Sequence, residues 1–366
     1  MDTISEIKDA VMPSLTEWLQ KIGHRDAEAF RAEDNAKRDR LEVLYQTIGL
    51  NYDRPERLTA RDITDRTPRF AEVLKSHGDR PTALRLIPYN PELPKLRVRG
   101  KTLKENLIWF SEQAIDPDQY RVEVIPHPDG ITPYAAIFLI NDHGAYGEIV
   151  PGWHWQLTQG INDHAIVSFA HDFSRCQLSE PDPDIQNVAQ SALDAVKVAD
   201  PGLRAKLQKS VAAEFTPSGH IKGYFEFVVL PSGEIQFIDY NRLLYTLLKD
   251  ARAALPESAG DLTGICACPG MVEGRVRVVT DPITADFNDG DILVCPMTMV
   301  EYVPLMKRAG AIITDRGNIL SHAAIVSREL RKPCIVGTKT ATSVLRDGQL
   351  VRIDAAAGSV FVLAET

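Results

Sequence analysis

The sequence has few cysteines, no long hydrophobic run and no excess of basic residues, and each absence narrows what the protein can be. Its five cysteines are an odd, sparse set, typical of reduced thiols in a cytosolic protein rather than of a disulfide framework. The longest apolar run, residues 135–140, is far shorter than the ~20 residues that cross a bilayer. No basic segment followed by an apolar one opens the chain, so no signal peptide is predicted. We therefore expect a cytoplasmic protein that does not insert into a membrane.

The charge balance argues against a nucleic-acid or membrane-surface partner. Lysine and arginine total 41 residues against 50 for aspartate and glutamate, which gives a net charge of -9. An acidic protein is repelled by phosphate polymers and anionic lipids, although a local basic pocket for a small phosphate ligand remains compatible with this charge. The length of 366 residues exceeds what one ordinary hydrophobic core supports, so two or three domains are expected.

Hydrophobic spacing divides the chain into four parts. Residues 1–80 are predicted to be a helical region, because apolar residues recur at helical spacing at positions 4, 7, 11, 15 and 19 and again at 41, 44 and 48. Residues 81–250 alternate between predicted strands and helices. Residues 251–263 are small, polar and broken by proline and glycine, as expected of a hinge linker. Residues 264–366 read as a compact α/β domain with short strands.

Several elements of the second part have clear local signals. Strands are predicted over residues 95–99, 120–125 and 134–140, and a hairpin pairs 224–230 with 234–239 across a Pro-Ser-Gly turn. Thr102 is a suitable N-cap for a helix that begins at Leu103. A further helix is predicted over residues 186–198.

His322 stands at the predicted start of a helix, where a histidine can accept a phosphoryl group and hand it on. Ser321 suits the N-cap position directly before it. At the first turn of a helix, unpaired amides and the positive end of the dipole favour an anion and keep an imidazole neutral and nucleophilic. Arg328 is a cation that could steady the phosphate, and the Thr298 hydroxyl is a candidate hydrogen-bond partner. The alternative is a histidine that caps the helix without chemistry.

Residues 264–366 resemble the mobile phosphohistidine domain of the phosphoenolpyruvate (PEP)-utilising enzymes, the family of phosphoenolpyruvate synthase and pyruvate phosphate dikinase. Residues 321–330 and 333–337 match the phosphohistidine signature, and residues 264–276 and 289–294 match the opening segments of that domain. The resemblance implies a swivelling β/β/α domain in which His322 is phosphorylated, with Ser321, Arg328 and Thr298 as its neighbours.

Two positions depart from the pattern of that family. Asn318 stands where a second glycine is usual, and Leu320 stands where a threonine is frequent. An apolar residue at the second position occurs in branches whose acceptor is not pyruvate. Leu320 therefore disfavours a plain phosphoenolpyruvate synthase.

A second constellation lies on the predicted hairpin. Glu226 on its first strand and Asp239 and Asn241 on its second offer oxygen ligands close together, and such ligands suit Mg²⁺ shared with nucleotide phosphates. The alternative is an ordinary hairpin with a solvated acidic edge. Upstream, Arg97 and Arg99 are predicted to share one face of a strand, where they could grip phosphates. A solvated basic edge explains that pattern equally well.

The hairpin resembles the last motif of the ATP-grasp fold. The resemblance to that fold covers residues from about 95 to 245. The resemblance implies an α/β and α+β multidomain protein in which an ATP-grasp-like nucleotide domain precedes the swivelling phosphohistidine domain. It implies ATP and Mg²⁺ as cofactors, with Glu226, Asp239 and Asn241 on the metal. Nucleotide contacts are then expected from Glu226 and from the residues Arg97, Arg99, Lys101 and Glu148.

The leading hypothesis is an ATP-dependent phosphotransferase of dikinase type that passes a phosphoryl group through His322 to a small-molecule acceptor, not certainly pyruvate. One alternative is a subunit whose acceptor site lies on a partner chain. Another is a regulatory protein that binds nucleotide without transferring phosphate. Assembly into a homo-oligomer is compatible with each of them.

Overall fold

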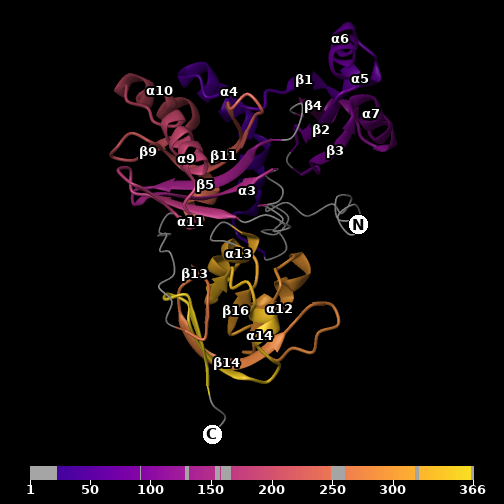
Figure 1. Ribbon diagram of the computed structural model, residues 1–366. Helices are drawn as coiled ribbons and strands as arrows, with labels where there is room; N and C mark the ends of the chain where they lie inside the picture. Colours follow the sequence, from indigo (N-terminus) through magenta and orange to yellow (C-terminus); the bar gives the residue numbers. More distant parts are fainter. Residues whose placement is uncertain are drawn as a thin grey trace.

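The computed structural model describes residues 23–90, 92–127, 132–152, 157, 166–248, 260–317 and 321–363. Over these residues the chain forms three sheets with helices packed against them (Figure 1). The predicted α/β multidomain class is confirmed. The predicted N-terminal helix at residues 4–19 and most of the predicted linker, residues 251–259, lie outside the described residues.

The small sheet has four antiparallel strands in the order β1-β4-β2-β3. Its elements are β1 (Glu56–Thr59), α5 (Ala60–Thr64), α6 (Pro68–His77), β2 (Pro81–Pro88), β3 (Leu96–Thr102), α7 (Leu103–Glu112), the 3-10 helix η1 (Pro117–Gln119) and β4 (Tyr120–Pro126). The Thr102 side chain accepts from the Glu105 amide and forms the predicted cap of α7. Because β1 pairs with β4, a boundary at residue 80 would divide this sheet.

The large sheet has seven strands, with the path β11-β10-β5-β6-β7-β8 and β9 paired beside β10. Its strands are β5 (Tyr134–Asn141), β6 (Gly144–Pro151), β7 (Val167–His171), β8 (Cys176–Leu178), β9 (Glu214–Phe215), β10 (Ile221–Val229) and β11 (Ile235–Asn241). The predicted hairpin is therefore confirmed as β10 and β11.

Helices cover the two faces of the large sheet differently. One face packs against α4 (Lys37–Ile48), α9 (Pro183–Ala195) and α10 (Pro201–Val211) in one buried apolar cluster. The helix predicted over 186–198 is α9, which begins three residues earlier because Asp182 caps it. The other face carries a second cluster that includes residues of α3 (Ala27–Asn35) and α11 (Arg242–Leu248).

The C-terminal domain is an eight-stranded sheet in the order β12-β19-β18-β14-β15-β16-β17-β13. Its strands are β12 (Leu262–Thr263), β13 (Ile265–Cys268), β14 (Met271–Val278), β15 (Ile292–Cys295), β16 (Ala311–Thr314), β17 (Cys334–Val336), β18 (Leu350–Asp354) and β19 (Ser359–Val362). Its helices are η2 (Val300–Tyr302), α12 (Val303–Arg308), α13 (His322–Leu330) and α14 (Ala341–Val344). Apolar clusters fill both faces of this sheet.

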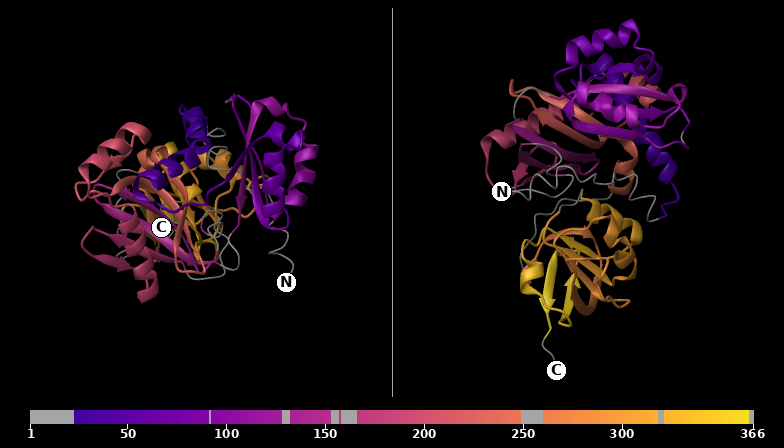
Figure 2. Two further views of the ribbon diagram at one scale, coloured as in Figure 1. Left: turned by 90° about the horizontal axis from the view of Figure 1, so that it is seen from above. Right: turned by 90° about the vertical axis from the view of Figure 1, so that its right-hand side faces the viewer.

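The C-terminal domain lies beside the large sheet and turns α13 toward it. Two roughly perpendicular views place the domain below that sheet (Figures 1 and 2), and α13 packs against α11. None of the helices in the described ranges combines the length and the apolar character needed to cross a bilayer.

Candidate functional site

One row of the large sheet gathers three carboxylates on a single face. Glu148 of β6 pairs with Ile137 of β5, Ile137 pairs with Glu226 of β10, and Glu226 pairs with Asp239 of β11. Directly paired residues on neighbouring strands point to the same side, so these side chains share one face. We call Glu148, Glu226 and Asp239 the acidic row. Glu148 and Asp239 are buried, and Glu226 is half-buried.

Glu226 is held in an environment that favours its protonated form. Burial and the nearby charge of Asp239 raise its pKa from 4.5 to about 7, although attraction to Lys37 opposes the rise. The Tyr224 hydroxyl donates a hydrogen bond of 2.7 Å to Glu226 Oε1. Like charges directly opposite one another destabilise a sheet. The pair of Glu226 and Asp239 therefore fits a site that binds a cation.

A chain of alternating charges leads away from Asp239 into the neighbouring helices. Lys37 Nζ, at the start of α4, lies 2.9 Å from Asp239 Oδ2 and 3.2 Å from Asp34 Oδ1. Lys95 Nζ, just before β3, lies 2.6 Å from Asp34 Oδ2. Burial alone would lower the pKa of Lys37, but attraction to Asp239 and Asp34 outweighs it and raises that pKa. Lys37 is therefore held as a cation beside the acidic row, whereas burial lowers the pKa of Lys95, which pairs with Asp34.

The oxygen atoms of the acidic row fit a divalent cation. Asp239 Oδ1 is buried and has no hydrogen-bond partner within the part of the chain that the structure describes, while Oδ2 already faces the Lys37 ammonium. Carboxylate oxygens in this position match the ligands that Mg²⁺ prefers. Asn241 Oδ1 instead accepts the Leu244 amide at the start of α11. No cluster of three or more His, Cys, Asp or Glu side chains in the described ranges has the arrangement of a complete metal site.

The predicted cations Arg97, Arg99 and Lys101 lie on β3, the edge strand of the small sheet, and all three are exposed. The pairing of β3 with β2 is regular through Val98 and irregular between Val98 and Lys101, so a bulge follows Val98. Partial desolvation of its guanidinium and repulsion from Arg97 lower the pKa of Arg99. The structure thus places these cations on the small sheet and the acidic row on the large one.

The residues that join these two sheets had no clear signal in the sequence. Lys37 and Asp34 lie in the first helical part of the chain, with Lys37 202 positions before Asp239, and were not predicted as site residues. Arg38 hydrogen-bonds Asp53 and lies 3.9 Å from Glu123 of β4, so it also links α4 to the small sheet. The cluster of acidic and basic residues over residues 33–40 is a local feature that could have drawn attention to them.

His322 is the first residue of α13, as predicted. Ser321 is the N-cap, and its hydroxyl accepts the Ala324 amide at 3.4 Å. Asn318 and Leu320 lie outside the described residues. Thr298 is buried, and its hydroxyl has no partner within the described ranges, so it remains available for a ligand. Burial lowers the pKa of Arg328, which lies near the thiols of the buried strands β13 and β17.

The helix that begins at His322 packs on the side of the large sheet that bears the acidic row. Ile325 of α13 is 2% exposed and belongs to the same apolar cluster as Ile137, Tyr224 and Tyr245. Ile137 lies within the register that joins Glu148 to Glu226. The structure therefore brings the predicted phosphohistidine helix and the predicted metal-binding hairpin to one face.

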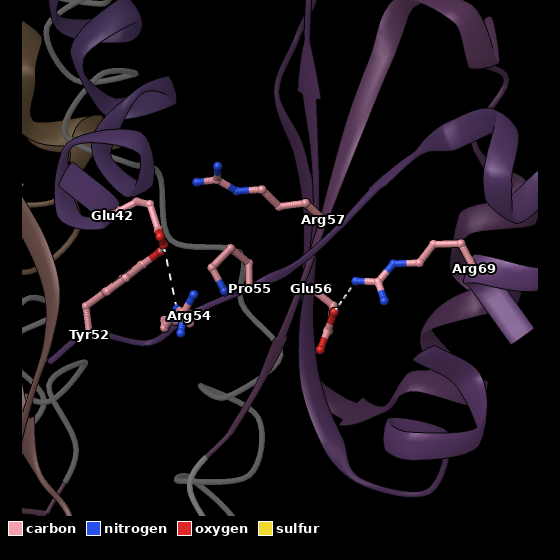
Figure 3. Close-up of a pocket in the computed structure, with 7 residues that line it drawn as sticks. All are labelled: Glu42, Tyr52, Arg54, Pro55, Glu56, Arg57 and Arg69. Carbon is pink, nitrogen blue, oxygen red and sulfur yellow. Dashed lines mark hydrogen bonds and ion pairs between the residues drawn. The ribbon is translucent and has the colours of Figure 1, made fainter. Parts of the chain in front are cut away.

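A separate pocket of about 520 Å³ lies beside the C-terminal part of α4, lined by Glu42, Tyr52, Arg54, Pro55, Glu56, Arg57 and Arg69 (Figure 3). Its cations face carboxylates: Arg54 lies 3.6 Å from Glu42, and Arg69 lies 2.6 Å from Glu56. Arg57 pairs with Asp39 at 2.9 Å. None of the residues predicted for the site lines this pocket.

Comparison with known proteins gives matches for the C-terminal domain. Residues 287–358 match the family model of the PEP-utilising enzyme mobile domain. The phosphoenolpyruvate synthase of Pyrococcus furiosus is 46% identical over 130 residues, which cover 34% of this chain and 16% of that protein. A probable phosphoenolpyruvate synthase of Archaeoglobus fulgidus is 42% identical over 132 residues, 34% of this chain and 18% of that protein. The matched part thus spans less than a fifth of these relatives.

Among solved structures, a D-alanine-D-alanine ligase from Coxiella burnetii aligns with 55% of this chain and 46% of its own. The identity is 13% and the TM-score is 0.28. A macrocyclase from Microcystis aeruginosa aligns with 57% of this chain at 16% identity and the same TM-score of 0.28.

Proposed function

We propose that this chain is an ATP-dependent phosphotransferase, because residues 287–358 match the mobile domain of the PEP-utilising enzymes. In this proposal His322 takes a phosphoryl group from nucleotide bound at the acidic row and passes it to a small-molecule acceptor. The two relatives described above are named as a phosphoenolpyruvate synthase and a probable phosphoenolpyruvate synthase, so pyruvate is the first acceptor to test.

One observation carries the proposal: α13, which begins with His322, packs on the same face of the large sheet as Glu226 and Asp239. A phosphoryl carrier has to bring its nucleophile to the nucleotide, and this packing supports such an approach. The buried Asp239 oxygen without a partner supports a metal requirement at the same place.

The chemistry assigned to the chain is mainly positioning and charge neutralisation, as is general for phosphoryl transfer. Mg²⁺, held by Asp239 and Glu226, would neutralise charge on the phosphates. Lys37, paired with Asp239, adds positive charge beside the acidic row. The neutral ring of His322 attacks phosphorus, so that an N–P bond forms as the P–O bond to the departing nucleotide portion breaks. The start of α13 then stabilises the anion that results.

The test is acid-labile labelling of the protein. The wild type is incubated with Mg-ATP labelled at either the β or the γ position, beside His322→Ala and the control His143→Ala, which alters an exposed histidine after β5. We expect label in the wild type and in His143→Ala and none in His322→Ala. Label from the β position is the dikinase outcome, and label from γ alone indicates a simple kinase step. Equal labelling of His322→Ala would refute the proposal.

A second candidate is a subunit whose acceptor site lies on a partner chain. The described residues form the small sheet, the large sheet that bears the acidic row and the C-terminal domain that carries His322, and this candidate assigns phosphoryl uptake to them and the acceptor site to another chain. In that case His322 would be labelled once, without sustained ATP consumption in the presence of pyruvate. Steady consumption by the isolated chain would exclude it.

A further inference from the structure

We propose that Ile325 and Glu329 of α13, together with His24, form a latch that seats the C-terminal domain on the acidic-row face during phosphoryl uptake. This inference rests on the proposed function and deepens it, because it names the residues that position His322 without touching the nucleotide. They are positioning residues for the first half-reaction only.

The apolar half of the latch is Ile325. It is buried in a cluster to which α3 contributes Phe30, α11 contributes Leu244 and Tyr245, and the large sheet contributes Tyr224. These residues all lie outside the C-terminal domain, so the burial of Ile325 arises from docking of one domain on the other. Since residues three apart lie on one side of a helix, Ile325 fixes the face of α13 that begins at position 322.

The polar half of the latch is a single contact. His24 Nε2 lies 2.7 Å from Glu329 Oε2, and the imidazole is nearly buried. His24 Nδ1 accepts the Asp26 amide at 3.0 Å, so the ring proton resides on Nε2 and is donated to Glu329. The His24 ring also meets Phe30 edge-to-face, with centroids 5.3 Å apart, so both halves converge on the same segment.

The two anchors define the orientation of α13 more tightly than either does alone. Ile325 and Glu329 are four residues apart, one turn of the helix, and both contact the region of α3. Two fixed points one turn apart set both the direction of the axis and its rotation. Within the described residues the latch itself is one buried aliphatic side chain and one hydrogen-bonded pair, so it suits a contact that forms and breaks in every cycle.

The experiment measures the single-turnover rate at which His322 is labelled by Mg-ATP, together with the radius of gyration by small-angle scattering. The variants are Ile325→Asp, the milder Ile325→Ala, Glu329→Ala, His24→Ala and the His24→Ala/Glu329→Ala double variant. Matched controls are Ile283→Asp, at an isoleucine of the same domain that is 81% exposed, and Glu301→Ala, at an exposed glutamate of that domain.

We expect Ile325→Asp to slow labelling by at least about tenfold and to enlarge the particle, since it places a charge in an apolar cluster. His24→Ala and Glu329→Ala should each slow labelling by about threefold to tenfold, the worth of one hydrogen bond. The double variant should be no slower than the worse single variant, because both changes remove the same contact. Label already on the protein should decay at the wild-type rate in nucleotide-free buffer.

The outcomes separate this inference from the function on which it rests. If the wild type takes no label, the proposed function fails, and scattering still reports whether Ile325→Asp and Ile325→Ala release the domain. If the wild type is labelled and Ile325→Asp is labelled equally fast, the latch is wrong. Additive effects in the double variant, or equal slowing in Ile283→Asp, would also overturn it.

Discussion

The two faces of the large sheet differ sharply, although the same strands build both. On one face Phe225 of β10 stacks between Phe138 of β5, at 5.0 Å between ring centroids, and Tyr240 of β11, at 4.9 Å. On the other face the next residue of β10 is Glu226, opposite Asp239. Adjacent residues on one strand thus serve packing and chemistry, because alternate side chains point to opposite sides.

The difference shows how a fold can tolerate an unfavourable cluster of charge. The aromatic face is closed by α4, α9 and α10 and contributes apolar burial, which is the main stabilising term in folding. In the acidic row, Asp239 is compensated locally by Lys37 and Glu226 by the hydrogen bond from Tyr224. Stability should therefore depend chiefly on the aromatic face, and phosphoryl uptake chiefly on the acidic row.

The largest effect should come from opening the aromatic face. Phe225→Ala removes a fully buried ring and should lower the free energy of unfolding by about 3–5 kcal/mol, measured by urea denaturation. Tyr89→Ala, at an aromatic side chain that is 57% exposed, is the control and should change it by less than about 0.5 kcal/mol. Similar losses for both would show that the aromatic face has no special role.

On the opposite face, Asp239→Asn should leave the fold intact and impair phosphoryl uptake. It removes the charge that pairs with Lys37 and the oxygen that would bind Mg²⁺, so labelling of His322 should slow by about 100-fold. Asp142→Asn, at an exposed aspartate paired with Lys222, should label at the wild-type rate. Unchanged labelling of Asp239→Asn would move the nucleotide site away from the acidic row.

Glu226→Gln should stabilise the metal-free protein in a pH-dependent way. The folded-state pKa of about 7 exceeds the ordinary value of 4.5, so between these pH values the folded chain holds a proton that the unfolded chain has released. Raising the pH through this window therefore favours unfolding. Glutamine stays neutral and can still accept from Tyr224, so the variant should gain about 2 kcal/mol at pH 8 and little at pH 4.

Urea denaturation at both pH values, with a chelator present, measures this difference. Glu234→Gln, in the turn of the same hairpin, is the matched control and should show no comparable pH dependence. If Glu226→Gln raised the free energy of unfolding equally at pH 4 and pH 8, a titrating carboxylate could not be the cause. Removal of such a carboxylate changes stability at pH 8, where it is charged in the folded protein, and hardly at pH 4.

Local periodicity predicted the hairpin and the helix at His322, because both are specified by residues close together in the sequence. Alternation placed Glu226 and Asp239 correctly on confirmed strands, and Ser321 was correctly expected as the cap of α13. Lys37 could not be predicted. It reaches Asp239 only through the packing of α4 on β11, and no local pattern records that contact.

The docking of the C-terminal domain on the large sheet likewise could not be predicted from the sequence. Ile325 reads as an ordinary core residue of an amphipathic helix, and Glu329 reads as a solvated charge. Their contacts with the first helical region depend on how two separately folded units meet. Periodicity predicts which residues of a helix or strand are buried. The element that covers those residues is determined by the tertiary structure.

The smallest effect concerns Asn241, which was predicted as a metal ligand but whose side-chain oxygen accepts the Leu244 amide at 2.8 Å. Asn241→Ala should lower the free energy of unfolding by about 1 kcal/mol, because it removes this cap of α11. Asn241→Asp keeps an acceptor and should lie within about 0.5 kcal/mol of the wild type. If Asn241→Asp is stable yet loses labelling, the amide serves the nucleotide as well. Wild-type labelling would leave Asn241 a structural residue, and the metal would be held by Glu226 and Asp239 alone.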